Sequence, residues 1–151
     1  MPIDAQERAR RRRLVTAHLD AEAAYDLDRI MATFAPNAIN SLNEMIAADP
    51  ATTRLLHIIG GWSTVPGVMS NIRSTQWAEH FTDDELIHEG HLHGKHTGFV
   101  PGFPPPTQLE IVVPYITFYR FDEHDLLASE HVRIDLSALY MPLRRNIAEG
   151  T

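Results

Sequence analysis

The sequence predicts an α+β fold with helices at the N-terminus and strands after them. Residues 5–34 carry apolar side chains at three-to-four spacing, which is typical of amphipathic helices. Residues 70–136 contain long segments of β-branched and aromatic residues separated by turn residues. Because the helices precede the strands and do not alternate with them, the pattern favours an α+β class over a parallel α/β sheet.

Composition narrows the class of protein further. The 151 residues predict one domain, 1–151, and the net charge of −7 argues against nucleic-acid or anionic-membrane partners. The chain has no cysteine, so disulfides and thiol chemistry are excluded. No apolar run approaches the length of a membrane span, and the first residues show no secretory signal. We therefore expect a cytoplasmic protein.

Two helices are expected at the start of the chain. Residues 5–24 form the first, with Leu14, His18 and Ala21 on its apolar stripe and the arginine-rich segment ERARRRRL as its exposed beginning. Asp26 is a typical N-cap for a second short helix, LDRIMATF, which Pro36 ends.

The rest of the chain contains one further helix and four strands. The third helix is expected from Asp49-Pro50 to Gly60-Gly61, because proline favours the first turn of a helix and glycine its end. The expected strands are residues 71–81, 86–94, 109–121 and 126–136, with a turn at TDDE, a Pro/Gly-rich loop at 97–108 and a turn at DEHD. Residues 37–48 show no clear pattern, and 62–70 indicate a loop.

The last two strands predict a lined pocket. Side chains alternate faces along a strand, so one face of the last strand carries Ser129, His131, Arg133 and Asp135. One face of the preceding strand carries Tyr115, Thr117, Tyr119 and Phe121. Charged side chains are costly to bury in the core without partners. We therefore expect these two faces to line one pocket together. The opposite face, with Ile116, Phe118, Val132 and Ile134, is the expected surface of a homodimer.

The segment HEGHLHGKHTG raises the question of a metal site. It contains His88, His91, His93 and His96. On a strand, His91 and His93 share one face, while the other two have the opposite parity. A stable site for zinc or a similar ion needs a third or fourth ligand, and none follows at suitable spacing. The sequence therefore predicts no metal here.

Three segments resemble, in order, parts of the SnoaL-like polyketide cyclases. LVTAHLDAEAAYDLDRIMATFAPNA resembles the two opening helices of that family. DDELIHEGHLHGKHTGFVPGFPPPT resembles its strand, its G-T-H-x-G turn and its G-x-P-P-T-G loop. FYRFDEHDLLASEHVRIDLSAL resembles its closing hairpin. The likeness covers residues 14–38 and 80–139. The family belongs to the superfamily of ketosteroid isomerase, scytalone dehydratase and nuclear transport factor two.

This resemblance implies a cone-shaped sheet, curved and mixed or antiparallel, wrapped by N-terminal helices around a deep pocket. It implies acid–base chemistry without a cofactor, in which an aspartate on the closing strand removes a proton and an aldol addition closes a ring. Asp135 is at the position of that aspartate, and His96 matches the histidine of the turn. Lys95, Gln108 and Arg133 depart from the family pattern. Arg133 would lower the pKa of Asp135 and weaken it as a base, unless the guanidinium holds the substrate.

Each candidate residue keeps two interpretations. Asp135 is an acid–base or half of a structural pair with Arg133, and His131 is a proton shuttle or a rim residue. The expected substrate-binding residues are His96, Tyr115, Tyr119, His18 and Tyr25. The alternative for Tyr115 and Tyr119 is that they only shape the pocket. The alternative for His18 and Tyr25 is that they belong to the helix core.

Three functions therefore remain open at this point. The first is an aldol-type cyclase acting on a polyketide-like or polycyclic carbonyl compound through Asp135, His131 and Arg133. The second is a dehydratase or isomerase in the same pocket. The third is a non-catalytic domain that binds a small apolar ligand or forms a dimer.

Overall fold

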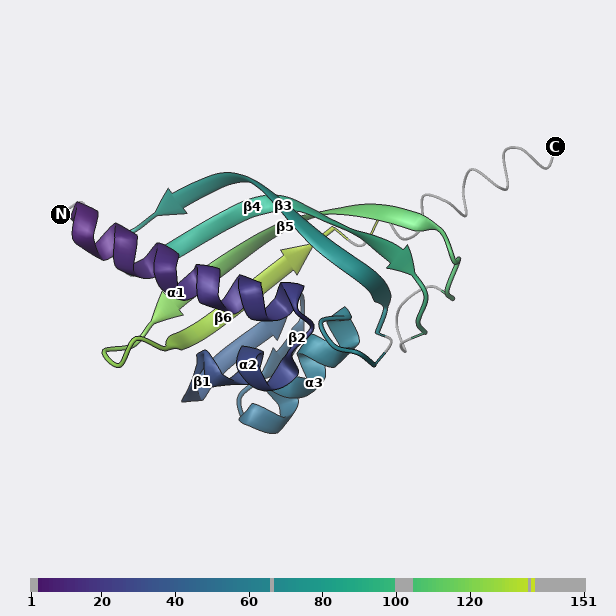
Figure 1. Cartoon of the computed structure of the whole chain (residues 1–151), viewed down its shortest axis with the longest axis horizontal. Coiled ribbons are helices and arrows are strands. Elements are labelled where there is room, and N and C mark those ends of the chain that lie inside the picture. The colour runs from purple at the N-terminus through teal and green to yellow at the C-terminus, as the bar shows by residue number, and fades with distance from the viewer. Residues whose placement is uncertain (1–2, 66, 100–104, 136, 138–151) are drawn as a thin grey trace.

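One curved sheet with three helices on one side of it forms the body of the molecule (Figure 1). The computed structural model describes residues 3–65, 67–99, 105–135 and 137. The elements in chain order are α1 (Ala5–Ala23), α2 (Leu27–Ala32), β1 (Phe34–Leu42), β2 (Met45–Ala47), α3 (Pro50–Gly60), β3 (Met69–Phe81), β4 (Glu85–His96), β5 (Glu110–Phe121) and β6 (Leu127–Ile134).

The sheet is mixed and open. Its strands lie in the order β2-β1-β6-β5-β4-β3, and within the described residues β2 and β3 are its two edges. The pairs β3–β4, β4–β5 and β5–β6 are antiparallel hairpins, whereas β1 runs parallel to β6. The predicted α+β class, the hairpin around TDDE and the last two strands are confirmed. Among the described residues no helix is both long and apolar enough to cross a membrane.

The short helix and the strand after it differ from the expectation. Pro36 does not end α2, which stops at Ala32, but lies inside β1. The pairing of β1 with β6 shifts register between Phe34 and Ile39. Proline has no N–H to give to a ladder, so it is tolerated where the ladder is interrupted. The sequence does not predict β1 because proline and asparagine hide the alternation of FAPNAINSL, and it does not predict β2 because that strand has only three residues.

The third helix is confirmed at both ends. The Asp49 side chain accepts a hydrogen bond from the Thr52 N–H, and Pro50 occupies the first turn. Gly61 ends α3 with a φ of 106°, a left-handed conformation that favours glycine. The helix is thereby held against the sheet with His57 facing inward, at 6% exposure.

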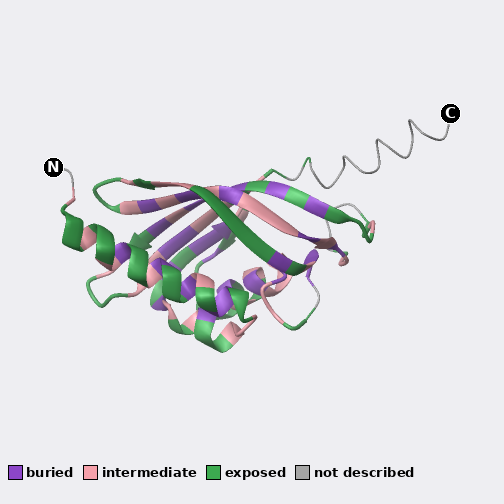
Figure 2. Ribbon diagram, turned by 45° about the horizontal axis from the view of Figure 1, so that its top comes forward, coloured by how far each residue is buried: buried purple, intermediate pink, exposed green. Residues whose placement is uncertain are grey.

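Two apolar clusters fill the space between the helices and the sheet. Figure 2 shows buried residues along the inner side of the strands and the exposed outer side of α1. The first cluster includes Val15, Ile30, Phe34, Leu86, Tyr119 and Leu127. The second consists of Val68, Met69, Ile72, Ile111 and Val113. Trp62 packs against both clusters and so joins them.

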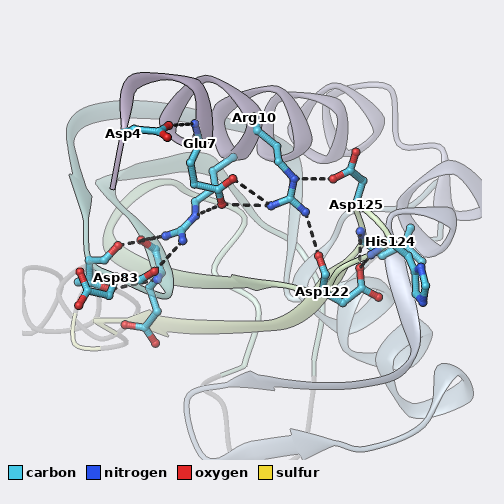
Figure 3. Close-up of polar contacts among 11 residues, drawn as sticks. Asp4, Glu7, Arg10, Asp83, Asp122, His124 and Asp125 are labelled. Carbon is cyan, nitrogen blue, oxygen red and sulfur yellow. Dashed lines mark hydrogen bonds and ion pairs between the residues drawn. The ribbon is translucent and has the colours of Figure 1, made fainter. Parts of the chain in front are cut away.

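Arginines of α1 fasten that helix to the two hairpins (Figure 3). Arg10 pairs with Asp125 at 2.5 Å and donates to the Asp122 carbonyl at 2.9 Å. Arg11 is buried and donates to the carbonyls of Thr82, Asp83 and Glu85 at 2.7–3.1 Å. The arginine-rich segment is therefore only partly an exposed helix start, and its buried member closes the β3–β4 turn.

Replacing Arg11 should cost stability, because three turn carbonyls would lose a charged donor. We expect Arg11→Met to lower the free energy of unfolding by about 2–4 kcal/mol in urea denaturation. The matched control is Arg13→Met on the same helix, where the exposed side chain should allow a change within about 0.5 kcal/mol. Equal effects of the two substitutions would contradict this role for Arg11.

Candidate functional site

An apolar cavity opens between α3 and the inner face of the sheet. Its empty space measures about 740 Å³ when the open mouth and the solvent in it are counted, and about 70 Å³ of this admits the centre of a water-sized sphere. Its apolar lining consists of Leu42, Leu56, Ile59, Trp62, Val68, Met69, Leu92, Val113, Val132 and Ile134. The ionisable side chains in the lining are Glu22, His57 and Glu130. The cavity can therefore hold an apolar molecule against a small group of charged side chains.

These charged side chains belong to a buried cluster of two histidines and two glutamates. His18 Nε2 lies 3.6 Å from Glu22 Oε1 and 3.5 Å from Glu130 Oε1. His57 Nε2 lies 3.9 Å from Glu22 Oε1 and 3.5 Å from Glu130 Oε2. His18 is fully buried behind the cavity, and the side chains of the other three residues are 6–8% exposed. We call these four residues the His–Glu cluster.

Three separate elements bring the cluster together. His18 and Glu22 are one turn apart on α1, so they share the side of the helix that faces the sheet. His57 comes from α3, and Glu130 from β6. A charged residue in a central strand is costly to bury unless it finds partners. Glu130 finds them in the two imidazoles, and this explains why the two helices dock over this point of the sheet.

Hydrogen bonds on the far side of each imidazole fix its orientation. His57 Nδ1 is 2.9 Å from the Thr53 carbonyl, which can only accept, so Nδ1 carries the proton. Thr33 Oγ1 donates to the Ile30 carbonyl at 2.6 Å and therefore accepts from His18 Nδ1 at 2.8 Å. In both rings Nε2 consequently faces the carboxylates.

Glu130 is held by its backbone as well as by its side chain. Its N–H donates to Asn40 Oδ1 at 2.8 Å, and Asn40 Nδ2 donates to Thr53 Oγ1 at 3.0 Å. This chain of bonds links β6, β1 and α3 beneath the cluster. The position of the carboxylate therefore depends on the parallel pairing of β1 and β6, in which Asn40 lies beside Glu130.

The charges of the cluster perturb one another strongly. Burial would lower the pKa of His18, but the carboxylates of Glu130 and Glu22 outweigh it and raise that pKa to about 10. Burial also opposes the charge of His57, whose pKa the same two carboxylates raise. Burial would raise the pKa of Glu130, yet His18 and His57 hold it well below its usual range. His18, His57 and Glu130 therefore stabilise one another's charged forms.

Comparison with known proteins defines the fold. No family model and no curated protein matches the chain. A candidate SnoaL-like polyketide cyclase from Jannaschia sp. CCS1 superposes with a TM-score of 0.73 at 15% identity, over 92% of each chain. A candidate hydroxylase from Streptomyces galilaeus gives 0.70 at 14% identity, over 91% of this chain and 82% of that one. An epoxide hydrolase from M. tuberculosis gives 0.62 at 12% identity, over 90% of both.

The chain has the SnoaL-like fold. Structures named as nuclear-transport-factor-two-like proteins superpose as well, with TM-scores of 0.65. The resemblance predicted from residues 14–38 and 80–139 is thus confirmed at the level of the fold. At identities of 10–17% the comparison shows the fold and carries no residue roles.

The face predicted for the closing strand was wrong. His131 pairs with Phe118 and Arg133 with Ile116, on the side away from the cavity. Val132 and Ile134, expected on the outer face, line the cavity instead. The cause is a register shift of one residue between the pairs Phe121–Leu127 and Arg120–Ser129. From Ser129 onwards, this shift exchanges the two faces of β6 relative to β5.

The three predicted catalytic residues are accordingly placed outside the cavity. Asp135 is exposed and accepts a hydrogen bond from the Ser137 N–H at 2.9 Å. Arg133 donates to Ser41 Oγ and to the Asn43 carbonyl, and no ion pair joins it to Asp135 within the described residues. His131 Nδ1 lies 2.9 Å from Ser41 Oγ. Catalysis by these residues stays an untested prediction that their placement does not favour.

The predicted substrate-binding residues are buried or engaged elsewhere. His18 belongs to the His–Glu cluster, and Tyr119 is buried beside it with ring centroids 6.3 Å apart. Tyr115 bonds Ser74 at 2.8 Å, and Tyr25 donates to the Ile72 carbonyl. His96 is fully buried near Thr107. None of the five side chains is part of the cavity lining, so their contact with substrate stays a prediction.

Sequence reasoning missed Glu22, His57 and Glu130. The spacing of His18 and Glu22, four apart on one helix face, was a usable signal. Glu130, which shares strand parity with the apolar Val132 and Ile134, was another signal, but using it required the register of the hairpin. For His57 we find no local signal, because α3 reaches the cluster only through the tertiary fold. Of HEGHLHGKHTG, His88 and His96 are buried while His91 and His93 are half-buried, with ring centroids 6.4 Å apart.

The charge of His18 should make the stability of the protein depend on pH. The pKa of His18 is raised to about 10 in the fold, so its contribution is complete below the unfolded value near 6.5 and is lost as pH rises towards 10. In chelator, we expect the free energy of unfolding to fall by about 1.4 kcal/mol per pH unit between about pH 7.5 and 9.

Urea denaturation at several pH values measures this slope. His18→Gln should flatten it, whereas His124→Gln, which changes a surface side chain that is 74% exposed, should leave it intact. A profile of unmodified protein that is flat over this range would show that His18 does not carry the charge.

Proposed function

We propose that the chain is an acid–base enzyme that forms an enolate from a carbonyl compound with a large apolar body, in an aldol-type cyclisation. One observation carries the proposal: Glu22, His57 and Glu130 are the ionisable part of the lining of a mostly apolar cavity, in which Asn40 and Ser41 are the other polar residues. An apolar wall selects a polyketide-like or polycyclic substrate by burial, and the few charged groups position its carbonyl.

The roles follow from which atoms reach the cavity. The Glu22 carboxylate takes the proton from the carbon next to the substrate carbonyl, and the electrons of that C–H bond move to the carbonyl oxygen. His57 Nε2, oriented by the Thr53 carbonyl, donates a hydrogen bond to this oxygen and stabilises the enolate. The enolate carbon then attacks a second carbonyl of the same molecule, and the new alkoxide receives the proton.

His18 and Glu130 act through the other two residues. His18 is fully buried, so it cannot touch a substrate, but it holds Glu22 and Glu130 in place. Glu130 faces both imidazoles and keeps His57 turned towards the cavity. We therefore assign positioning roles to these two. All steps are proton transfers and carbon–carbon bond formation, so the reaction consumes no redox equivalents.

The structural neighbours support this choice of chemistry without fixing it. Several are named as candidate polyketide cyclases, and one is named as an epoxide hydrolase. Polyketide cyclisation needs an apolar cavity and an acid–base pair, and in this proposal the cavity beside α3 with Glu22 and His57 supplies them. The substrate we propose is accordingly a polycyclic or polyketide-like carbonyl compound.

A homodimer through the outer face of the sheet remains part of the proposal. Ile116 and Phe118 alternate with the buried residues of β5 and face outward, and Val112 on the same face is 50% exposed. Val132 and Ile134 do not contribute, because they line the cavity.

Exchange of α-protons for deuterium tests the proposed function without knowledge of the natural substrate. The probe is 2-tetralone, a bicyclic ketone, incubated with chelator-treated protein in D2O and followed by proton NMR. We expect Glu22→Gln to slow the catalysed exchange by about 10²–10⁴-fold, since the carboxylate that takes the proton is lost. Glu123→Gln, an exposed glutamate on the β5–β6 turn, is the matched control and should exchange at the normal rate.

Asp135→Asn decides between the two candidate bases. Full activity in this variant together with loss in Glu22→Gln supports the His–Glu cluster. The opposite result, or exchange that no variant changes, would contradict the proposal and return the choice to a closing-strand aspartate or to a binding domain.

A further inference from the structure

The side chains of the His–Glu cluster lie too far apart for ordinary hydrogen bonds. The four contacts between imidazole nitrogen and carboxylate oxygen measure 3.5–3.9 Å, whereas direct N–H···O bonds measure about 2.7–3.2 Å. His18 Nε2 is fully buried and has no hydrogen-bond partner among the described residues. Each of the two Nε2 atoms thus lies near two carboxylate oxygens but beyond ordinary hydrogen-bond distance from them.

Such spacing fits donors around a metal ion. With metal–ligand bonds of about 2.1 Å, neighbouring donors of a tetrahedral site lie about 3.4 Å apart. The ligand atoms of His18, Glu22 and His57 all lie within 4.8 Å of one another. Glu130 faces both Nε2 atoms at 3.5 Å and can add a further oxygen.

The orientation of the imidazoles fits the same purpose. Metal-binding histidines usually donate their other N–H to a carbonyl, carboxylate or hydroxyl oxygen, which fixes the ring and leaves the free nitrogen for the metal. His57 does so to the Thr53 carbonyl, and His18 does so to Thr33 Oγ1. These contacts are independent of the distances inside the cluster, and they also fit metal binding.

We propose that His18, Glu22 and His57 form a binding site for a divalent transition-metal ion, with Glu130 as the second carboxylate beside it. Two imidazoles with carboxylates suit zinc, cobalt or ferrous iron better than magnesium or calcium, which prefer oxygen ligands alone. The two carboxylates balance the charge of a divalent ion. Since Glu22 and His57 line the cavity, a ligand in the cavity could reach the ion.

This inference uses the same side chains as the proposed function but does not rest on it. A bound ion would take the place of the protons on the two Nε2 atoms, so the metal-bound and proton-bound clusters are alternative forms. Metal binding is measured without substrate, and α-proton exchange is measured in chelator. Failure of one therefore leaves the other standing.

The half-buried histidines of β4 supply the control for non-specific binding. His91 and His93 lie on the outer side of β4 with ring centroids 6.4 Å apart, and such a pair could bind zinc weakly. Within the described residues, however, the set of at least three close metal-ligand side chains consists of His18, Glu22 and His57. The double variant His91→Gln/His93→Gln removes both imidazoles of this pair on β4 and leaves the proposed site unchanged.

Titration of ZnCl2 into chelator-treated, dialysed full-length protein without an affinity tag tests the proposal by calorimetry. We expect one tight site per chain that the His91→Gln/His93→Gln variant retains. Glu22→Gln and His57→Gln should each weaken it at least about tenfold. Co2+ in place of Zn2+ should give visible absorption bands of a low-coordinate ion, and these should be lost in the same two variants.

Circular dichroism checks that each variant folds. Glu22→Gln conserves the shape of the side chain, so it decides the matter if His57→Gln is unfolded. Three results would overturn the proposal: no stoichiometric zinc binding, binding that Glu22→Gln leaves unchanged, or binding that disappears with His91 and His93.

Discussion

The structure depends on one buried carboxylate, that of Glu130, lying between two imidazoles. The residue is in a central strand, where a charge without partners would cost several kcal/mol. His18 from α1 and His57 from α3 each approach it at 3.5 Å. Because these partners come from separate helices, the requirement to neutralise one glutamate constrains how both helices sit on the sheet, and with them the floor of the cavity.

The surrounding fold serves to keep that arrangement rigid. Arg10 and Arg11 fasten the beginning of α1 to both hairpins, so that its last turns present His18 and Glu22 to the sheet. Asn40 ties the backbone of Glu130 to α3 through Thr53. The apolar clusters on either side exclude water, which strengthens every electrostatic contact in the cluster. The same four side chains are therefore suited both to proton transfer and to holding a cation.

Local patterns in the sequence predicted most of the elements but not the site. Asp26, Asp49 and Gly61 marked helix ends correctly, because capping depends on neighbouring residues only. The faces of β6 followed from parity, yet a bulge beside Arg120 reversed which face meets the cavity. A single-residue shift leaves no mark in the pattern of side chains, so the sequence could not reveal it. As a result Glu130 and Val132, and not His131 and Arg133, face the cavity. His57 reaches the site through the packing of α3, which local pattern cannot reveal.

A double-mutant cycle between His18 and Glu130 tests the central claim most directly. The free energy of unfolding would be measured by urea denaturation, in chelator at neutral pH, for His18→Gln, Glu130→Gln and the double variant. If the two charges support each other in the core, each single change is strongly destabilising and the pair is non-additive, with a coupling of about 2 kcal/mol or more. Additive effects of the two substitutions would show that the cluster is not the interaction on which this fold depends.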